Sequence, residues 1–471
     1  MVVVLAFCGS QLIASPASRP MTPTVSIEAK ADRRWSVTYE SSAPARVLVF
    51  DRSPDTSRIK IWTVPASFEL IANDRGELVR RRDGAPFTTV TIGVRAAYQE
   101  LPKDYAPFSP FGDGGMLAHS GRFFACAEKC PDKPEWRFLL RAPAGQHVIV
   151  DGRRHAGSAA WRDRDEGRNV YVGATEPIET PDVLAVVDTS LPADIRSRLD
   201  TELPRSMRFF AARLGALPSR PLLFASYDAA HRPGWGRQGG TFPGQVFTHF
   251  YGSGWSAEMA KPGFDFDLAW FFAHEAGHLY QRQITASEKG AAWVHEGAAE
   301  AFAAIALRQL NPALAPQIDA KVAEARTACA TATAKRPLNV AVDEGDFDAA
   351  YSCGLLINLA IHDAALAARP GSAGLFTVWR SFADTARGGR SPTLGKFTHA
   401  VSEIAGGCTA GKVGEAASTT QASTIMIAVR SCPGRARSVA KQTSRLRTPA
   451  ETRRMVSFRQ VEPFNNTSGD L

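Results

Sequence analysis

The segment that most constrains the fold of this chain places two histidines four residues apart, in the run FFAHEAGHL at positions 271–279. In a helix, His274 and His278 lie about 6 Å apart along the axis and on one face. Both imidazoles can then reach one zinc ion at ~2.0–2.1 Å. Glu275 is offset by one residue, which places its carboxylate near a water held by the ion without ligating the ion itself. The run therefore predicts a helix with a metal site and a general base.

Metal binding needs a third protein ligand, and a candidate follows in the run WVHEGAAE at positions 293–300. Glu296 comes eighteen positions after His278. A helix, a turn containing Ser287 and Gly290, and a second antiparallel helix fit that separation. Glu296 then completes an open site of two histidines and one glutamate, which holds one zinc ion per chain. The alternative is a buried helix whose polar residues are satisfied elsewhere.

Two further residues of this second run flank the third ligand. Glu300 lies four positions after Glu296 and therefore on the same helix face. We expect Glu300 to accept the free ring N–H of His274 and to orient that ligand. The alternative is a solvated helix carboxylate, although the alanines around Glu300 favour burial. His295 is the direct neighbour of Glu296 and is expected to point elsewhere.

The run HEAGH followed by WVHEGAAE resembles the gluzincin metallopeptidases, notably their aminopeptidase-N-like and glycyl-aminopeptidase-like branches. The resemblance covers roughly Arg220 to Ala405. It implies a thermolysin-like, mostly helical catalytic domain, zinc as the cofactor and Glu296 as the third ligand. It also implies hydrolysis of peptide bonds, with a peptide as the substrate.

The same resemblance extends to a tyrosine further along the chain. The run YSCG at positions 351–354 is similar to a Tyr-x-x-Gly segment that opens a later helix in the family. By this resemblance Tyr351 would donate a hydrogen bond to the developing oxyanion. Without the family, Tyr351 is an ordinary aromatic residue at a helix start.

One segment departs from the family pattern. Aminopeptidase-N-like enzymes place a Gly-x-Met-Glu-Asn edge strand upstream of the zinc helix, and its glutamate binds the free amine of the substrate. This chain has GGTFPGQ at positions 239–245, without an acidic residue. Gly239 and Gly240 can still pair with a substrate backbone if they lie in an edge strand, whereas the alternative is a plain glycine-rich loop. The departure leaves both aminopeptidase and endopeptidase action open.

The remaining patterns predict an α+β chain, with an N-terminal β-rich domain followed by the helical catalytic domain. Apolar residues alternate at Trp35, Val37 and Tyr39, and turn residues separate further short apolar runs before residue 180. Helical spacing takes over in positions 192–214, where Pro204 is a candidate kink. With 471 residues the chain is too long to fold around a single hydrophobic core of ordinary size. We expect a signal peptide at 1–18, the β-rich domain at 19–180, the catalytic domain at 181–408, and a basic, poorly ordered tail at 409–471.

The N-terminus and the cysteines favour an exported, periplasmic or extracellular protein. The start MVVVLAFCGSQLIASPAS is apolar and ends in small residues, as a secretory signal does, although it lacks a positively charged start. A lipidated Cys8 and a buried N-terminal strand are the alternatives. Six cysteines then remain, and we expect disulfides between neighbours, with reduced buried thiols as the alternative. The expected pairs are Cys126–Cys130, Cys329–Cys353 and Cys408–Cys432.

The formal charge of +8 does not indicate a nucleic-acid-binding protein. From Arg435 to the end there are eight Lys or Arg and three Asp or Glu, so most of the excess lies in the tail. Zinc-finger spacing, an aromatic-basic signature and a basic recognition helix are all missing from the sequence. No apolar run reaches the ~20 residues of a membrane-spanning helix. We therefore expect neither specific nucleic-acid binding nor a transmembrane segment in the mature chain.

Three functions fit these observations. The first is an exported zinc peptidase, and the second is a metal-dependent hydrolase of a non-peptide substrate, since sites and folds are reused. The third is a catalytically silent binding protein on the same scaffold. A silent relative has no physical need to keep a base at Glu275, which favours an enzyme.

Overall fold

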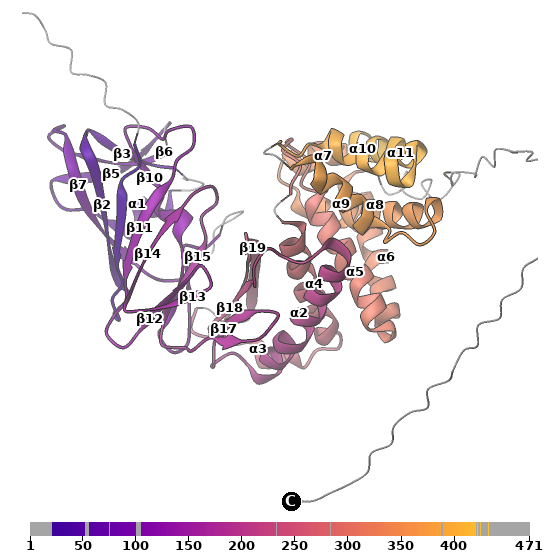
Figure 1. The fold of residues 1–471 in the computed structure, drawn as a ribbon, viewed down its shortest axis with the longest axis horizontal. Coiled ribbons are helices and arrows are strands. Elements are labelled where there is room, and N and C mark those ends of the chain that lie inside the picture. Colours follow the sequence, from indigo (N-terminus) through magenta and orange to yellow (C-terminus); the bar gives the residue numbers. More distant parts are fainter. Residues whose placement is uncertain are drawn as a thin grey trace, which may run out of the picture. The chain divides into compact units, whose positions relative to one another are not determined.

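The computed structural model describes residues 21–420, apart from 52–55, 75, 100–104, 232, 283 and 388–389. It also describes three single residues further on. The signal peptide expected at 1–18 and the basic residues 435–471 lie outside the described residues. Within the described part, strands dominate the first half and helices the second (Figure 1). The predicted α+β architecture, a β-rich region followed by a helical region, is confirmed. The three described residues beyond 420 are Ala422, Thr424 and Cys432.

The N-terminal region consists mainly of strands in which buried side chains alternate with more exposed ones. Trp35, Val37 and Tyr39, where the sequence predicted this alternation, are all buried. Period-two alternation places these side chains on one face of a strand, where they form a core with the opposite sheet. Its elements are β1 (Thr24–Glu28), β2 (Arg34–Ala45), β3 (Val47–Phe50), α1 (Ser57–Ile61), β4 (Trp62–Thr63), β5 (Phe68–Asn73), β6 (Gly76–Arg81), β7 (Phe87–Arg95), β8 (Phe108–Pro110), β9 (Met116–His119), η1 (Ser120–Phe123), β10 (Ala125–Ala127), β11 (Trp136–Arg141), β12 (His147–Val150), β13 (Arg153–Ala156), β14 (Ser158–Asp163) and β15 (Asn169–Gly173).

These strands form three sheets within the described residues. The first has the order β14-β11-β1-β2-β7-β4, the second β10-β3-β6-β5 and the third β13-β12-β15-β9-β8. In the first sheet β1 and β2 are antiparallel, with Val25 opposite Tyr39, whereas β1 and β11 are parallel. In the third sheet β15 pairs antiparallel with β9, with Tyr171 opposite Leu117.

A fourth, mixed sheet begins the second region. Its strands are β16 (Ile178–Glu179), β17 (Leu184–Val187), β18 (Leu222–Asp228), β19 (Gly236–Phe242) and β20 (Gln245–Tyr251), in the order β16-β17-β18-β20-β19. Strands β17, β18 and β20 are parallel, and β19 returns antiparallel to β20 as the edge strand. The glycine-rich segment is therefore an edge strand and not a loop.

Helices make up the rest of the described chain. Helix α2 covers the segment in which helical spacing was predicted, with Pro204 inside it. Helices α4 and α5 pack against each other, and α5 also packs against α8. The helices are α2 (Ala193–Leu214), α3 (Trp255–Met259), α4 (Phe264–Gln281), α5 (His295–Leu310), η2 (Pro312–Leu314), α6 (Ala315–Ala332), α7 (Leu338–Asp343), α8 (Phe347–Ala368), α9 (Leu375–Thr385), α10 (Leu394–Ala405) and α11 (Gly407–Ser418).

The ordered chain extends past the boundary expected at residue 408, because α11 continues to Ser418. Its buried side chains include Val413 and Ala416, which give it an apolar face against the helices beside it. The disulfides join the expected neighbours, and one of them ties the start of α11 to the chain beyond it. The pairs are Cys126–Cys130, Cys329–Cys353 and Cys408–Cys432.

One apolar cluster joins the β-rich region to the mixed sheet. Side chains of the third sheet and its loops pack against side chains of β17, β18, β19 and β20. A polar contact reinforces this junction, since the buried Gln245 amide bonds to both the N–H and the carbonyl of Asn169 at 2.9 and 3.0 Å. The junction holds the β-rich region against the mixed sheet. The cluster consists of Phe111, Leu117, Ile149, Tyr171, Leu184, Val186, Leu222, Phe224, Phe242 and Phe247.

Among the described residues, α8 is the one helix long and apolar enough to cross a membrane by length and composition. Its apolar window has a mean hydropathy of 1.3, and 61% of that window is buried inside the protein. A core helix that packs on several sides has the same composition, and α8 packs against α5, α6 and α10. The expected lack of a membrane-spanning segment stays a prediction.

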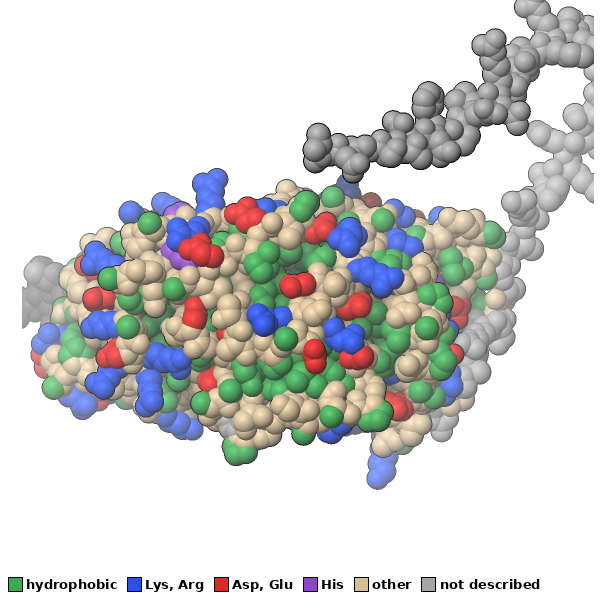
Figure 2. Space-filling view, turned by 90° about the horizontal axis from the view of Figure 1, so that it is seen from below, with side chains coloured by type: hydrophobic (Ala, Val, Ile, Leu, Met, Phe, Trp, Pro, Cys, Tyr) green, Lys and Arg blue, Asp and Glu red, His purple; other side chains and the backbone are tan. Residues whose placement is uncertain are grey.

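Charges are mixed on the face shown in Figure 2, where Lys and Arg side chains alternate with Asp and Glu side chains. Several exposed ion pairs occur in the protein, such as Arg80 with Glu69 at 2.6 Å and Arg154 with Glu176 at 2.8 Å. Pairs of this kind contribute little to stability. The mixture of signs does keep this face from being uniformly basic.

Helices α5 and α8 touch through two glycines, which makes one substitution informative. A Cβ on Gly297 would lie 2.2 Å from the Gly354 Cα, so the two backbones would have to separate. We expect Gly297→Ala to lower the free energy of unfolding by about 1–3 kcal/mol. Gly411→Ala is the matched control, because a Cβ there meets nothing within 4 Å. Denaturant unfolding followed by circular dichroism measures both, and equal stability of the two variants would contradict the close approach.

Candidate metal centre

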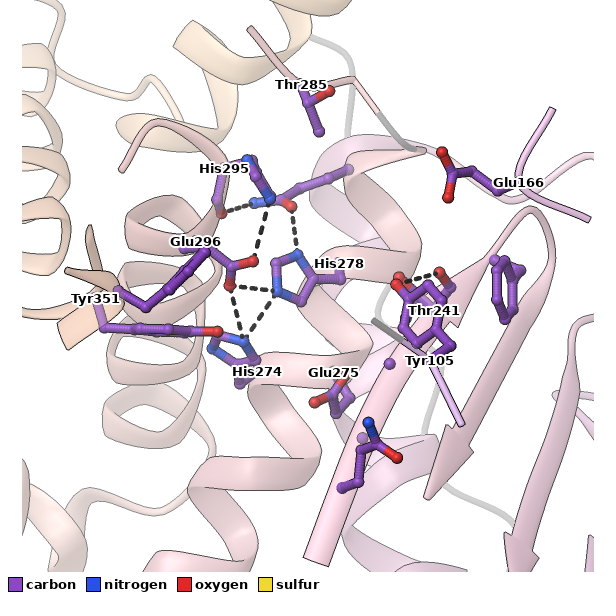
Figure 3. Close-up of a pocket in the computed structure, with 16 residues that line it drawn as sticks. Tyr105, Glu166, Thr241, His274, Glu275, His278, Thr285, His295, Glu296 and Tyr351 are labelled. Carbon is purple, nitrogen blue, oxygen red and sulfur yellow. Dashed lines mark hydrogen bonds and ion pairs between the residues drawn. The ribbon is translucent and has the colours of Figure 1, made fainter. Parts of the chain in front are cut away.

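The three residues expected to hold a metal come from two neighbouring helices. His274 and His278 lie on α4, and Glu296 lies in the first turn of α5. One ligand atom from each lies within 4.8 Å of the other two. The Nε2 atom of His278 is 3.0 Å from Glu296 Oε2, and the Nε2 atom of His274 is 3.6 Å from the same oxygen. The three side chains therefore point at one place (Figure 3).

In both histidines the Nδ1 atom faces away from the point at which the three ligand atoms converge. His278 Nδ1 lies 2.8 Å from the Gln281 side-chain oxygen, and His274 Nδ1 lies 2.8 Å from Glu300 Oε1. Both partners present an acceptor oxygen, which favours the ring proton at Nδ1 and a lone pair at Nε2. The two Nε2 atoms nevertheless lie only 2.9 Å apart, beside a carboxylate oxygen. A cation between these three atoms would relieve their mutual repulsion, and two imidazoles with one carboxylate suit zinc.

The electrostatics of His274 agree with a site for positive charge. Burial alone would lower the pKa of this imidazole, but the carboxylates of Glu296 and Glu300 raise it well above its usual value. The attraction that these carboxylates exert on a proton also acts on a divalent ion. The residues present therefore fit a bound metal.

Glu300 lies where helical spacing predicted it, one turn after Glu296 and against His274. Its side chain is only 13% exposed, which does not fit a solvated carboxylate. The indole Nε1 of Trp270 lies 3.1 Å from both Glu300 oxygens. Trp270 is one turn before His274 on α4, and it was not predicted from the sequence although its spacing of four residues is visible there.

His295 was expected to point elsewhere, but it faces Glu296. Its Nε2 lies 3.1 Å from Glu296 Oε1, and its ring lines the cavity. Consecutive helix residues are separated by only about 100° around the axis, so two long side chains can still meet. His295 thereby holds one oxygen of Glu296 and leaves the other oxygen to face His274 and His278.

Glu275 lies on α4 beside the ligands and inside the cavity (Figure 3). Burial raises the pKa of its carboxyl, while the neighbouring histidines oppose that rise. A Cβ on Gly239 would lie 2.4 Å from Glu275 Oε1, so the absence of a side chain at position 239 lets this carboxylate reach the edge strand. Arg237, two residues earlier on β19, stacks on Phe271 with its guanidinium carbon 4.6 Å from the ring centre.

Tyr351 lies near the start of α8, and its ring points toward His274 (Figure 3). Its ring centre is 5.8 Å from that of His274. Burial and the nearby carboxylates of Glu296 and Glu275 raise the pKa of Tyr351, which keeps the phenol protonated and able to donate. The Gly297–Gly354 contact brings α8 close enough for this placement.

The three candidate ligands, Glu275 and Tyr351 line one cavity of about 720 Å³, together with residues that were not predicted from the sequence. Some of the added residues belong to the β-rich region, which offered no local signal, because only tertiary packing brings it to the site. Gly239 and Gly240, expected to contact substrate, also line the cavity. Its lining is Tyr105, Glu166, Gln238, Gly239, Gly240, Thr241, Phe242, His274, Glu275, His278, Gln281, Thr285, His295, Glu296, Phe347 and Tyr351.

The fold is similar to that of solved M1 zinc metallopeptidases, in which a β-rich region precedes a helical one. The structure of the M1 zinc metallopeptidase from Deinococcus radiodurans is 15% identical with a TM-score of 0.52, and the match covers 85% of this chain and 94% of that one. A mutant of that enzyme bound to a Tyr-Ser-Ala substrate matches at 14% identity and a TM-score of 0.52, over 85% and 95% of the two chains. Yeast LTA4 hydrolase matches at 10% identity and a TM-score of 0.51, over 83% of this chain and 66% of that one. No protein-family model and no curated protein sequence matches the chain.

Proposed function

We propose that this chain is a zinc-dependent metallopeptidase that binds one zinc ion through His274, His278 and Glu296. The observation that carries the proposal is the convergence of these ligands beside a buried carboxylate, that of Glu275, in an open cavity. The M1 fold supports it, because it is the fold of zinc metallopeptidases. Three protein ligands leave a coordination position open, as in catalytic zinc sites.

Each residue around the site has a separate role in the proposed reaction. A bound zinc ion would polarise the scissile carbonyl and make a nearby water more acidic. Glu275 accepts the proton of the attacking water at its carboxylate and passes it to the leaving amine. Tyr351 donates a hydrogen bond from its hydroxyl to the oxygen on which negative charge develops. Glu300 holds the His274 ring in place.

Peptides are the substrates that the comparisons support. The related enzyme from Deinococcus radiodurans has been seen with a Tyr-Ser-Ala substrate. In this chain, Gly239 and Gly240 lie on the edge strand β19 within the cavity, where an extended peptide can pair with the strand. Strand β19 reads GRQGGTF, so the strand itself supplies no carboxylate for a substrate amine.

We also propose that the protein acts outside the cytoplasm, in the periplasm or the extracellular space. Three disulfides support this location, because such bonds persist in oxidising compartments. The apolar start of the sequence supports export. Mass spectrometry of the protein secreted or released from the periplasm would give the mature N-terminus and the disulfide state. Reduced cysteines in protein isolated from its own cells would contradict the proposal.

The zinc-loaded protein is expected to hydrolyse short peptides, and the ends of the products identify the type of peptidase. Peptides with a free and an acetylated N-terminus are incubated with the enzyme and followed by mass spectrometry. Release of single N-terminal residues from the free peptides alone indicates an aminopeptidase, whereas internal cleavage of both indicates an endopeptidase. Cleavage of none of them, with zinc bound at one ion per chain, would favour a non-peptide hydrolase or a binding protein.

Tyr351→Phe is expected to lower kcat about a hundredfold while leaving zinc content unchanged. The reason is that the variant loses only the hydroxyl that faces the developing oxyanion. Tyr227→Phe is the matched control, since its hydroxyl donates to the Gly252 carbonyl at 3.1 Å, outside the cavity. A loss confined to KM, or an equal loss in the control, would contradict the role of Tyr351.

A further inference from the structure

One charged side chain of the edge strand has no role in the reaction proposed above. Arg237 lies on β19, and its guanidinium group stacks on the Phe271 ring of α4. No hydrogen bond or ion pair joins Arg237 to another residue within the described part of the chain. Arginine stays charged in proteins, so this side chain presents a cation whose N–H donors are not used by a neighbouring carboxylate.

Three carboxylates lie near this cation without binding it. Burial lowers the pKa of the Arg237 guanidinium, and the negative charges of Asp267, Glu275 and Glu258 oppose that fall. Glu275 faces the metal site, and Glu258 forms an ion pair with Lys261 at 2.5 Å. Asp267 is exposed in the first turn of α4. The stacked guanidinium is therefore fixed on α4 through an aromatic ring and not through an acid.

Arg237 shares its face of β19 with Gly239. Side chains alternate along a strand, so these two positions point the same way and lie about 7 Å apart. A Cβ on Gly239 would lie 2.7 Å from Phe271 Cζ, whereas a Cβ on Gly240 would lie 2.7 Å from the Phe247 ring on the other face of the sheet. Arg237 therefore lies on the face of β19 that is turned to α4, the helix that carries two of the candidate zinc ligands.

The outer edge of β19 is the place proposed above for an extended peptide. Strand β20 pairs with one edge of β19, and no described strand pairs with the other edge. Side chains of a peptide added at this edge would point to the same two faces as those of β19. The peptide residue opposite Arg237 would have its Cβ about 4.5–5.5 Å from the arginine Cβ. It would lie two residues from the one opposite Gly239.

The direction of the peptide decides which half of the substrate meets Arg237. Strand β19 runs from Gly236 to Phe242, so a peptide in the commoner antiparallel arrangement runs the other way. Its C-terminal half then extends from Gly239 toward Arg237. This is the half that leaves with the new amine after Glu275 has passed a proton to it.

From this geometry we propose that Arg237 determines specificity by binding a carboxylate of the substrate on the C-terminal side of the cleaved bond. Two groups supply such a carboxylate: the α-carboxylate at the end of a short peptide, and the side chain of Asp or Glu. A guanidinium group matches either of them with two parallel N–H bonds. The inference rests on the proposed peptidase function and adds the charge of the leaving half to it.

Four peptides of one sequence distinguish the two sources. They combine a free or amidated C-terminus with Glu or Gln at one position, and this position is scanned along the peptide. Each peptide is measured as kcat/KM on zinc-loaded wild type, Arg237→Gln and Arg237→Lys. Each is also measured as Kd by calorimetry on zinc-loaded Glu275→Gln and on Glu275→Gln/Arg237→Gln, so that binding is measured without hydrolysis.

Arg237→Gln is expected to lower kcat/KM and to weaken binding about tenfold for the peptide that carries the recognised carboxylate, mainly through KM. The peptide without that carboxylate should be unaffected, and Arg237→Lys should restore part of the loss, because it keeps the charge but not the planar group. If the tenfold loss disappears on amidation of the C-terminus, the α-carboxylate is the ligand. If it disappears when Gln replaces Glu, the side chain is the ligand.

Arg213→Gln is the matched control, because it removes another stacked arginine. Arg213 lies on α2 with its guanidinium carbon 3.5 Å from the Phe209 ring centre, and it is not among the cavity residues. The proposal for Arg237 is overturned if Arg237→Gln affects all four peptides equally, if Arg213→Gln has the same effect, or if no peptide binds. The peptidase proposal fails separately, when peptides bind with the predicted preference for a carboxylate but zinc-loaded wild type cleaves none of them.

Discussion

Glu275→Gln is expected to keep its zinc and to lose about 10²- to 10⁴-fold in kcat. The amide has the size of the carboxylate but accepts no proton from the attacking water. The metal should stay, because the three ligand atoms that converge belong to His274, His278 and Glu296. Steady-state hydrolysis of a good peptide substrate gives kcat, and elemental analysis of the same sample gives zinc per chain.

Glu324→Gln is the matched control for this prediction, since it makes the same change on an exposed part of α6. A useful third variant is Gly239→Ala, whose Cβ would lie 2.4 Å from Glu275 Oε1. It should displace the carboxylate and lower kcat with zinc content unchanged. Full turnover by Glu275→Gln at normal zinc content would rule out Glu275 as the base.

Glu296→Gln and His274→Ala are expected to abolish stable zinc binding and reduce hydrolysis to background. Each removes one of three protein ligands, and each leaves the other two without the charge or geometry that holds a divalent ion. The measurement is zinc per chain after dialysis against a weak chelator. A second measurement is thermal unfolding with added zinc, because an ion that binds only the folded state raises the Tm. Wild type should show this rise and the two variants should not.

Two further variants serve as comparisons for this prediction: His399→Ala is a control without an expected effect, and Glu300→Gln has an expected intermediate effect. His399 is an exposed histidine on α10, with a side chain 68% exposed, and its substitution should leave zinc binding unchanged. Glu300 supports His274 without ligating the ion, so Glu300→Gln should weaken zinc binding by about 10–100-fold. Zinc retained at one ion per chain by both Glu296→Gln and His274→Ala would contradict the ligand set.

The candidate site was largely predictable because its central residues are close in sequence. Helical periodicity alone puts His274 and His278 on one face, and the same rule pairs Glu296 with Glu300. The structure brings these four side chains together at the expected places. The prediction for His295 was wrong, because neighbouring helix positions do not exclude contact between long side chains.

The β-rich region was predictable only as a class. Alternating apolar residues predicted strands, and the buried Trp35, Val37 and Tyr39 confirm that pattern. The order of the strands in three sheets did not follow from the pattern, because period-two alternation fixes which face is buried but not which strand is the neighbour. The cysteine pairs were predicted from proximity, and the structure confirms them.

The amino-acid sequence determined the local chemistry of this protein: two helical runs that carry two imidazoles and two carboxylates at helical spacing. Tertiary structure decided what surrounds them. It brought α8 against α5 through Gly297 and Gly354, and placed Glu166 on the cavity wall from the loop between β14 and β15, far before α4 in the sequence. The physical reason is that helical spacing follows from backbone geometry within a few residues, whereas contacts between distant segments depend on how whole apolar faces pack.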